Sequence, residues 1–220
     1  MPGGPESTPG VRVLAGLEPF LVRGLEPVSR DLETYAELLT RWQIVQNLVS
    51  RETLAQIWGR HMRDSLQLLG HIAPGERFFL DLGSGGGFPA VPLAIALKGG
   101  GAQFHLIESN KRKASFLRTV VRELGLSVKV HGRRVEEVAQ EDVGEVHLVT
   151  CRATASLGVV FGLGAPFWSE KTRGLFHKGR EYGGELVKAR ADWCFDVVEL
   201  PSETDKDSRI LAIRMLRVRS

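Results

Sequence analysis

Apolar positions recur at helical spacing in the first third of the chain. They fall three or four residues apart, which places them on one side of a helix. Ser29 directly precedes this run, and its hydroxyl can accept a hydrogen bond from the first helical turn. The pattern therefore predicts a helix over residues 29–47, with these apolar positions on its buried side: Leu32, Tyr35, Leu38, Leu39, Trp42 and Val45.

The flanking segments complete an expected N-terminal helical unit. Shorter apolar patterns predict helices over residues 51–57 and 58–69. Proline and glycine at positions 74 and 75 predict a turn that ends the unit. We expect a helical subdomain over residues 29–74 and, because the preceding residues are rich in proline and glycine, a flexible segment over residues 1–28.

From residue 75 onward, short apolar runs alternate with amphipathic stretches. This alternation predicts a mostly parallel sheet with helices on both faces, as in a doubly wound α/β domain over residues 75–220. Helices are expected over 89–98, 110–124, 155–163 and 181–191, with a short turn near 135–139. Strands are expected over 77–82, 103–107, 127–131, 145–150, 172–177, 194–200 and 209–217.

The last two expected strands have no helix between them. A polar loop over residues 202–208 joins them, which predicts a hairpin whose last strand runs antiparallel to the rest. A seven-stranded sheet that ends in this way is typical of the methyltransferase variant of the Rossmann-like fold. The predicted fold class is therefore the S-adenosylmethionine-dependent methyltransferase fold with additional N-terminal helices.

A glycine-rich loop joins the first expected strand to the next helix. It reads Asp81-Leu82-Gly83-Ser84-Gly85-Gly86-Gly87-Phe88-Pro89. Gly83 and Gly85 allow unusual backbone angles and a close approach to a nucleotide-like ligand, since no β-carbon stands in the way. A structural turn without a ligand is the alternative interpretation.

Three residues, two of them in or next to this loop, bear on the identity of the ligand. Phe88 occupies the position of the third glycine in the dinucleotide fingerprint, which disfavours a nicotinamide cofactor. Asp81 can lie near the positive ammonium group of S-adenosyl-L-methionine. Glu108 ends the second strand, 25 residues after Gly83, near the spacing at which an acid accepts hydrogen bonds from a ribose. We therefore expect S-adenosyl-L-methionine as the cofactor.

Later strand ends supply weaker candidates. Val135 and Glu136 follow the third strand and could address an adenine edge, although acidic residues on a short helix are usually solvated. Arg152 follows the fourth expected strand and Lys178 follows the fifth, at the sheet edge where ligands bind in such folds. We expect Arg152 and Lys178 to position the substrate; a surface ion pair is the alternative. No residue is assigned as a general acid or base.

Composition and charge narrow the class of protein further. The chain has 220 residues, of which 43% are hydrophobic and 25% charged. It lacks a run of about 18 apolar residues, so we expect no membrane span. Two cysteines without a metal-type spacing indicate a reduced, cytoplasmic protein with no metal site. We also expect a monomer.

Positive charge is concentrated between residues 110 and 134. Eight basic residues stand there against one acid, a net charge of +7, whereas the whole chain carries +3. Such concentration favours a phosphate-rich partner, although a solvated helix face is the alternative. The candidate RNA-binding residues are Lys111, Arg112, Lys113, Arg133 and Arg134.

Taken together, several short motifs resemble a known family over about residues 30–190. The chain is similar to the bacterial 16S ribosomal RNA guanine-N7 methyltransferases, also called glucose-inhibited division protein B. The motifs are Arg41-Trp42 with Asn47-Leu48, Arg60-His61 with Asp64-Ser65-Leu66, Asp81 to Pro89, Glu108-Ser109 with Lys111 and Phe116-Leu117, Arg134-Val135-Glu136, and Arg152-Ala153.

The resemblance implies methyl transfer from S-adenosyl-L-methionine to N7 of a guanine in 16S rRNA of the small ribosomal subunit. It also implies that Glu108 holds the ribose and that the cofactor contacts fall at Gly83, Phe88, Val135, Glu136 and Arg152. A ribosome- or RNA-binding protein with a retained cofactor pocket, and a nicotinamide-dependent oxidoreductase, are the competing hypotheses.

Overall fold

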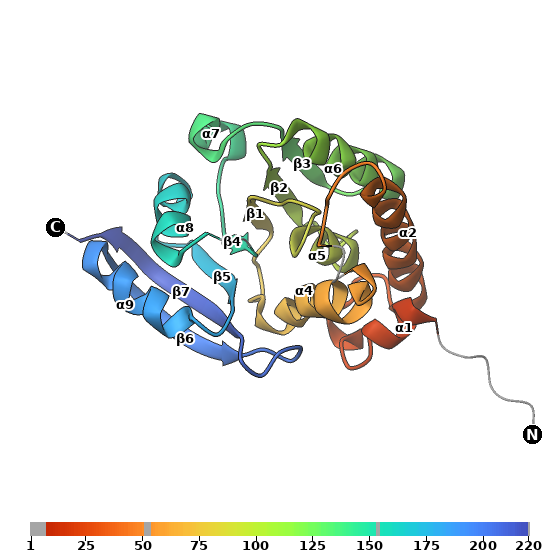
Figure 1. Cartoon of the computed structure of the whole chain (residues 1–220), viewed down its shortest axis with the longest axis horizontal. Helices are drawn as coiled ribbons and strands as arrows, with labels where there is room; N and C mark the ends of the chain where they lie inside the picture. The colour runs from red at the N-terminus through yellow and green to blue at the C-terminus, as the bar shows by residue number, and fades with distance from the viewer. Residues whose placement is uncertain (1–7, 51–53, 153–154, 220) are drawn as a thin grey trace, which may run out of the picture.

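A seven-stranded sheet forms the centre of the molecule (Figure 1). The structure is a computed structural model that describes residues 8–50, 54–152 and 155–219. The strand order is β3-β2-β1-β4-β5-β7-β6. The strands are β1 (Phe78–Leu82), β2 (Gln103–Ile107), β3 (Val128–His131), β4 (Leu148–Cys151), β5 (Arg173–Lys178), β6 (Trp193–Pro201) and β7 (Arg209–Val218).

The register confirms the predicted fold class. Strands β1 to β5 pair in parallel, whereas β7 pairs antiparallel with both β5 and β6. The expected C-terminal hairpin is therefore present, with its polar loop at the carboxyl edge of β5, because Lys178 pairs with Arg209 at the start of β7. All the parallel crossovers thus leave the sheet at the same edge as this loop.

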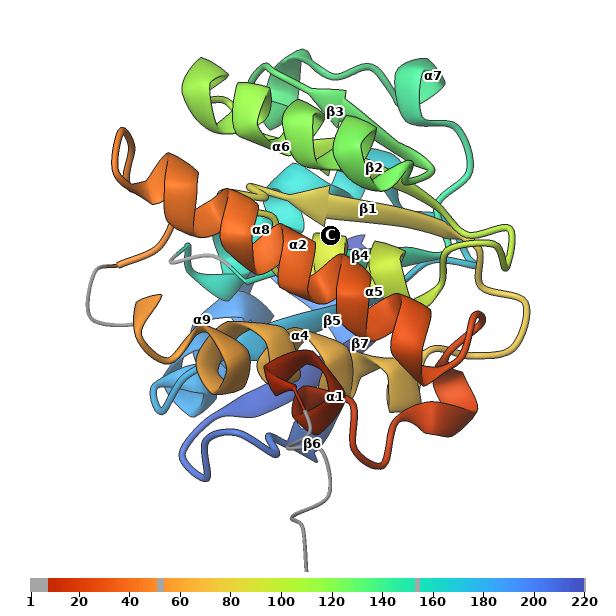
Figure 2. The ribbon, with the colours of Figure 1, turned by 90° about the vertical axis from the view of Figure 1, so that its right-hand side faces the viewer.

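Helices cover both faces of the sheet, as Figures 1 and 2 show. One face packs against α2 (Leu25–Gln43), α5 (Ala90–Ala96) and α6 (Lys111–Leu124). The other face packs against α8 (Leu157–Gly164) and α9 (Tyr182–Asp192). The shorter elements are α1 (Pro9–Val13), α4 (Asp64–Leu66) and α7 (Gln140–Val143), together with a π-helical segment (Ile57–Arg63) and the 3-10 turns Glu18–Phe20, Gln67–His71, Val135–Glu137 and Ala165–Phe167.

Local sequence signals set the bounds of helix α6. The Asn110 side chain accepts hydrogen bonds from the backbone N–H groups of Arg112 and Lys113, at 3.0 and 3.2 Å. Such a cap satisfies amide groups that have no partner within the helix. The helix ends at Gly125, whose φ of 56° is left-handed and favours glycine. The predicted helix over 110–124 is confirmed.

The N-terminal region differs from the prediction. Residues 8–28 were expected to be flexible, yet they form α1 and the Glu18–Phe20 turn, and Leu14 and Leu17 are buried in the core. Apolar contacts outweigh the proline and glycine content here. The prediction that Ser29 caps the helix was wrong, because α2 begins at Leu25 and Gly24 occupies the N-cap position. Ser29 lies inside the helix, where its hydroxyl donates a hydrogen bond to Glu33.

The following helices also depart from the predicted pattern. The helix expected over 29–47 ends at Gln43, and the one expected over 58–69 is divided into the π-helical segment, α4 and a 3-10 turn. The helix expected over 51–57 falls partly on residues 51–53, which lie outside the described residues. Within the described part, these helices share one continuous hydrophobic core with the sheet.

Candidate functional site

The glycine-rich loop lies at the carboxyl edge of the sheet, between β1 and α5. Gly87 has a φ of 99°, which L residues rarely adopt. A β-carbon there would lie 2.6 Å from Val91 Cγ2 and 2.9 Å from the Tyr35 hydroxyl. Gly85 also has a positive φ, 55°, but its β-carbon would meet no described atom closer than 3.9 Å. Gly87 therefore fixes the loop to the core, whereas Gly85 leaves space above it.

Tyr35 on α2 binds the backbone of this loop. Its hydroxyl donates a hydrogen bond to the carbonyl of Gly86 at 2.5 Å, and its ring packs against Phe88 and Phe116. Burial raises its pKa well above the ordinary value, so the hydroxyl stays protonated and can donate. Sequence reasoning placed Tyr35 only in the core of α2, because a tyrosine in an apolar stripe carries no sign of a distant partner.

Asp81 is the last residue but one of β1, next to the glycine-rich loop, and is 1% exposed. Its Oδ1 accepts a hydrogen bond from the Thr150 hydroxyl at 2.7 Å, whereas Oδ2 has no hydrogen-bond partner in the described part of the chain. Burial raises the pKa of Asp81 to about 7, against the lowering effects of Thr150, Ser84 and Arg152. A buried carboxylate oxygen without a donor fits a cationic ligand group.

Glu108 joins the glycine loop to the end of β2. Its Oε2 accepts a hydrogen bond from the Gly85 backbone N–H and its Oε1 from that of Asn110, both at 2.7 Å. The structure therefore brings Glu108 and Gly85 together, as expected for one ligand site. Each carboxylate oxygen has a further lone pair with which to accept a hydroxyl donor.

A cavity of about 240 Å³ lies beside Gly83. The predicted Val135 and Glu136 line it together with Gly83, and apolar side chains from β1, β2 and α8 also line it. This mixture of apolar and polar side chains suits a nucleoside base. The lining residues are Leu82, Gly83, Ile107, Ser109, Arg133, Arg134, Val135, Glu136, Cys151, Ala155, Val160 and Leu163.

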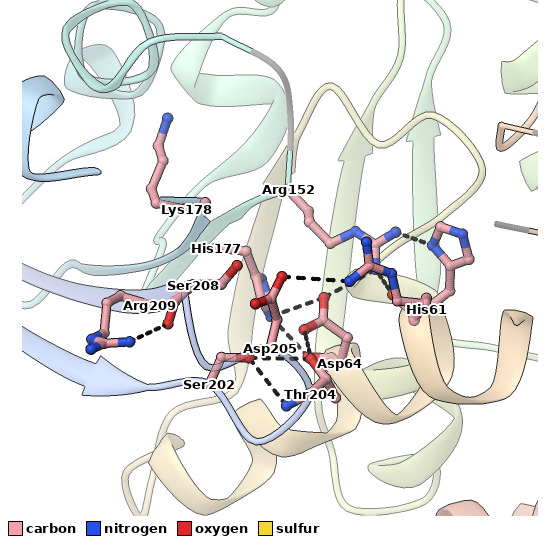
Figure 3. Close-up of a pocket in the computed structure, with 12 residues that line it drawn as sticks. His61, Asp64, Arg152, His177, Lys178, Ser202, Thr204, Asp205, Ser208 and Arg209 are labelled. Carbon is pink, nitrogen blue, oxygen red and sulfur yellow. Dashed lines mark hydrogen bonds and ion pairs between the residues drawn. The ribbon is translucent and has the colours of Figure 1, made fainter. Parts of the chain in front are cut away.

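Arg152 follows β4 and lines a second cavity, of about 290 Å³ (Figure 3). Its guanidinium contacts His61 Nδ1 and donates to the Asp64 carboxylate at 3.2 Å. It also lies 5.1 Å from the centre of the Phe88 ring. Burial and the nearby Arg152 lower the pKa of His61 to about 4, so His61 is neutral at pH 7 and can accept from the guanidinium.

Asp64 connects Arg152 with two other elements. Its Oδ1 accepts from Thr204, in the β6–β7 loop, at 2.6 Å and from Gln67 at 2.8 Å, and its carbonyl accepts from His177 Nε2 at 2.8 Å. Asp64 directly follows the π-helical segment, a geometry often found at functional sites. The sequence placed Asp64 in a family motif near His61 but did not predict its contacts with Arg152, His177 and Thr204, because these partners lie up to 140 residues away.

The structure does not bring the Lys178 ammonium together with Arg152. Lys178 lines the same cavity, but its amine points away from the cluster in Figure 3. Its Nζ donates to the Ala155 carbonyl and to the Glu185 carboxylate, both at 2.7 Å. Lys178 thus ties β5 to α9 in this conformation.

The predicted RNA-binding residues divide into two kinds. Lys111, Arg112 and Lys113 form the first turn of α6, and none of them has a carboxylate partner in the described part of the chain. Arg134 is also exposed, whereas Arg133 forms an ion pair with Asp142. The three cations of the first α6 turn are therefore not neutralised by a described carboxylate, whereas Arg133 is.

The described residues contain neither a candidate membrane-spanning helix nor a candidate metal site. No helix among them is long and apolar enough to cross a membrane. Within the same ranges, no group of three or more histidine, cysteine, aspartate or glutamate side chains could hold a metal ion.

The fold and the position of the site define a Rossmann-like methyltransferase domain. Among solved structures, the chain is similar to a methyltransferase from Podospora anserina bound to S-adenosylhomocysteine, with a TM-score of 0.58 and 16% identity over 84% of this chain and 87% of that one. It is also similar to a chain of a fibrillarin/Nop5p complex, with a TM-score of 0.54 and 16% identity over 68% of this chain and 78% of that one. At this level of identity the likeness concerns the fold.

Sequence comparison shows the family. The model of the family "rRNA small subunit methyltransferase G" matches residues 28–211, and the chain belongs to this family. It is 43% identical to the ribosomal RNA small subunit methyltransferase G of Parvibaculum lavamentivorans, over 87% of each chain. It is 44% identical to that of Methylorubrum populi, over 86% of this chain and 91% of the relative. The resemblance drawn from the short motifs is confirmed.

Proposed function

We propose that this protein transfers a methyl group from S-adenosyl-L-methionine to N7 of a guanine in 16S rRNA. The observation that carries the proposal is the buried Asp81 next to the glycine loop, whose Oδ2 lacks a donor among the described residues. A pyrophosphate would repel a carboxylate there, whereas the ammonium group of S-adenosyl-L-methionine supplies the missing positive partner. Family membership supports rRNA as the methyl acceptor.

The described residues suit each part of this cofactor. Asp81 would hold the ammonium group, and Glu108, which fixes the loop through Gly85, would accept hydrogen bonds from the ribose. Val135 and Glu136 would bind the adenine in the 240 Å³ cavity. When bound, the cofactor supplies an activated methyl group on a sulfonium, which becomes a neutral thioether after transfer.

The acceptor chemistry agrees with a site in which we assign no general base. Guanine N7 carries a lone pair and no proton, so a new N7–methyl bond can form while the sulfur–methyl bond breaks, with no deprotonation. The task left to the protein is to hold N7 in line with the methyl group. We assign this task to Arg152, and its contacts with His61 and Asp64 in the cavity of about 290 Å³ support the assignment.

Transfer of a radiolabelled methyl group tests the proposal. We expect purified protein to label small ribosomal subunits, or 16S rRNA, taken from cells that lack the protein, and not subunits from cells that contain it. Nuclease digestion and mass spectrometry of the labelled rRNA should give N7-methylguanine. Labelling at another base atom would contradict the N7 assignment. Binding to subunits without any transfer would instead identify a non-catalytic binding protein.

Cofactor binding is expected to depend on pH through Asp81. Its pKa of about 7 means that raising the pH from about 6 to about 8 ionises the carboxylate that would bind the ammonium. The Kd of S-adenosylhomocysteine, measured by calorimetry, should therefore fall about tenfold over this range. Asp81→Asn should bind more weakly and show a flat profile. A wild-type profile in Asp81→Asn would exclude Asp81 as the titrating group.

The same group should affect folding with the opposite sign. In the unfolded chain Asp81 ionises near 3.8, whereas in the folded protein it stays protonated up to about pH 7. Between these values the folded state holds one more proton, so the contribution of Asp81 to stability falls as the pH rises. Urea unfolding of the ligand-free protein should therefore show a smaller fall between about pH 4 and pH 7 in Asp81→Asn than in the wild type.

A further inference from the structure

Two large aliphatic side chains stand exposed directly after helix α2. Ile44 is 85% exposed and Val45 is 72% exposed. Isolated apolar residues on a surface are common, but an adjacent pair is a candidate contact. We call residues 44–50 the α2 loop, and we call the face formed by Ile44, Val45, Lys111, Arg112 and Lys113 the α2–α6 surface.

The α2 loop has a defined shape. The Gln43 side chain accepts from the backbone N–H groups of Leu48 and Val49, at 2.9 and 3.1 Å, and donates to the Val49 carbonyl at 2.8 Å. Gln46 donates to the carbonyl of Arg112 at 3.3 Å, which joins the loop to the start of α6. Figure 2 shows both segments at the same side of the molecule. These polar contacts hold the loop while its two aliphatic side chains face solvent.

Positive charge lies beside the aliphatic pair. The first turn of α6 contains Lys111, Arg112 and Lys113 and no acidic residue. A cavity of about 420 Å³ separates Lys113 from the α2 loop. The loop also approaches the glycine loop, since the Leu48 carbonyl oxygen would lie 3.1 Å from a β-carbon at Gly86. The α2–α6 surface therefore continues directly from the candidate cofactor site.

We propose that the α2–α6 surface binds the RNA strand that flanks the methylated nucleotide. Lys111, Arg112 and Lys113 contact its phosphates, and Ile44 and Val45 pack against the face of an unpaired base or its ribose. This inference rests on the proposed function, because it assumes an RNA substrate at the adjacent site. Charge complementarity favours RNA over a protein, since three adjacent cations in a helical turn without an acidic residue suit a polyanion.

The packing contact and the phosphate contacts predict different salt behaviour. Removing a cation lowers the slope of log Kd against log salt, by about 0.7 for each phosphate contact on a single strand. Removing an uncharged side chain weakens binding equally at every salt concentration. The aliphatic pair can therefore be examined separately from the lysines and the arginine.

The test compares two double variants in equilibrium binding to a protein-free 16S rRNA fragment. Ile44→Ser with Val45→Ser should raise the Kd about tenfold, equivalent to about 1.4 kcal/mol, without changing the salt slope. Val159→Ser with Val187→Ser is the matched control, because these side chains are 53% and 73% exposed on α8 and α9. The control should bind like the wild type, and both variants should keep the wild-type Kd for S-adenosylhomocysteine. The methyl-transfer KM for RNA should rise in parallel with the Kd, at an unchanged kcat.

Each other outcome has a definite meaning. An unchanged Kd in Ile44→Ser with Val45→Ser overturns the inference. Weaker binding to assembled subunits but not to protein-free RNA also overturns it and identifies a ribosomal protein as the partner. Binding is measured without methyl transfer, so a wild-type protein that binds RNA without methylating it refutes the proposed function and not the surface.

Discussion

Replacing Gly87 with alanine is expected to lower the free energy of unfolding by about 3 kcal/mol. Two energetic costs, backbone strain and steric overlap, add up to this value. The φ of 99° is strained for any residue with a side chain, and the new methyl group would lie 2.6 Å from Val91 Cγ2 and 2.9 Å from the Tyr35 hydroxyl. For a chain of this size the melting temperature should fall by about 6–12 °C. The displaced loop should also bind S-adenosylhomocysteine more weakly.

Gly85→Ala is the matched control for this experiment. Gly85 lies in the same loop with a φ of 55°, but its β-carbon would meet no atom of the described residues closer than 3.9 Å. We expect a melting temperature within about 3 °C of the wild type, because a left-handed φ alone costs about 1 kcal/mol. Thermal unfolding of the ligand-free proteins measures both variants. Equal melting temperatures for Gly87→Ala and Gly85→Ala would contradict the role of Gly87 in fixing the loop to the core.

Local patterns predicted the sheet, most of its helices and the position of the glycine-rich loop between β1 and α5. Strands β1 and β4 are short apolar runs that end near polar residues. The carboxyl ends of parallel strands share one edge of the sheet, so the pattern alone predicted which edge would bind a ligand. Glu108 was expected at this edge from its spacing, and in the structure its carboxylate accepts a hydrogen bond from the backbone N–H of Gly85 in the glycine-rich loop. These features depend on residues close in sequence or on the regular geometry of the fold.

The long-range polar contacts could not be predicted from the sequence. Tyr35 bonds Gly86, 51 residues away, and Asp64 bonds Thr204, 140 residues away. Neither contact leaves a periodic signal, because each depends on a single pair of residues that are far apart in the sequence. For Lys178, the sequence predicted the position in the fold but not the partner. It lies at the carboxyl edge of the sheet as expected, but its ion pair with Glu185 on α9 was not predicted.

Arg152→Ala is expected to reduce methyl transfer at saturating substrate by about 100-fold. The guanidinium contacts His61, Asp64 and the Arg60 carbonyl at once, and it lies over Phe88. Its loss would remove the contacts that join these groups in the cavity of about 290 Å³. Arg152→Lys should recover little activity, because a single ammonium cannot reproduce the planar set of donors. Initial rates with labelled S-adenosyl-L-methionine and small ribosomal subunits measure the effect.

Arg60→Ala separates this effect from a general loss of positive charge. Arg60 lines the same cavity, but its side chain is 50% exposed and its one described ion pair, with Asp205, is 3.5 Å long. Because such an exposed pair contributes little to stability, Arg60→Ala mainly removes one positive charge. The variant should therefore raise the KM for RNA severalfold and leave kcat nearly unchanged. Arg152→Ala should instead lower kcat, while its melting temperature shows whether the fold survives. A folded Arg152→Ala protein with the wild-type kcat would mean that Arg152 organises the cavity without positioning the acceptor base.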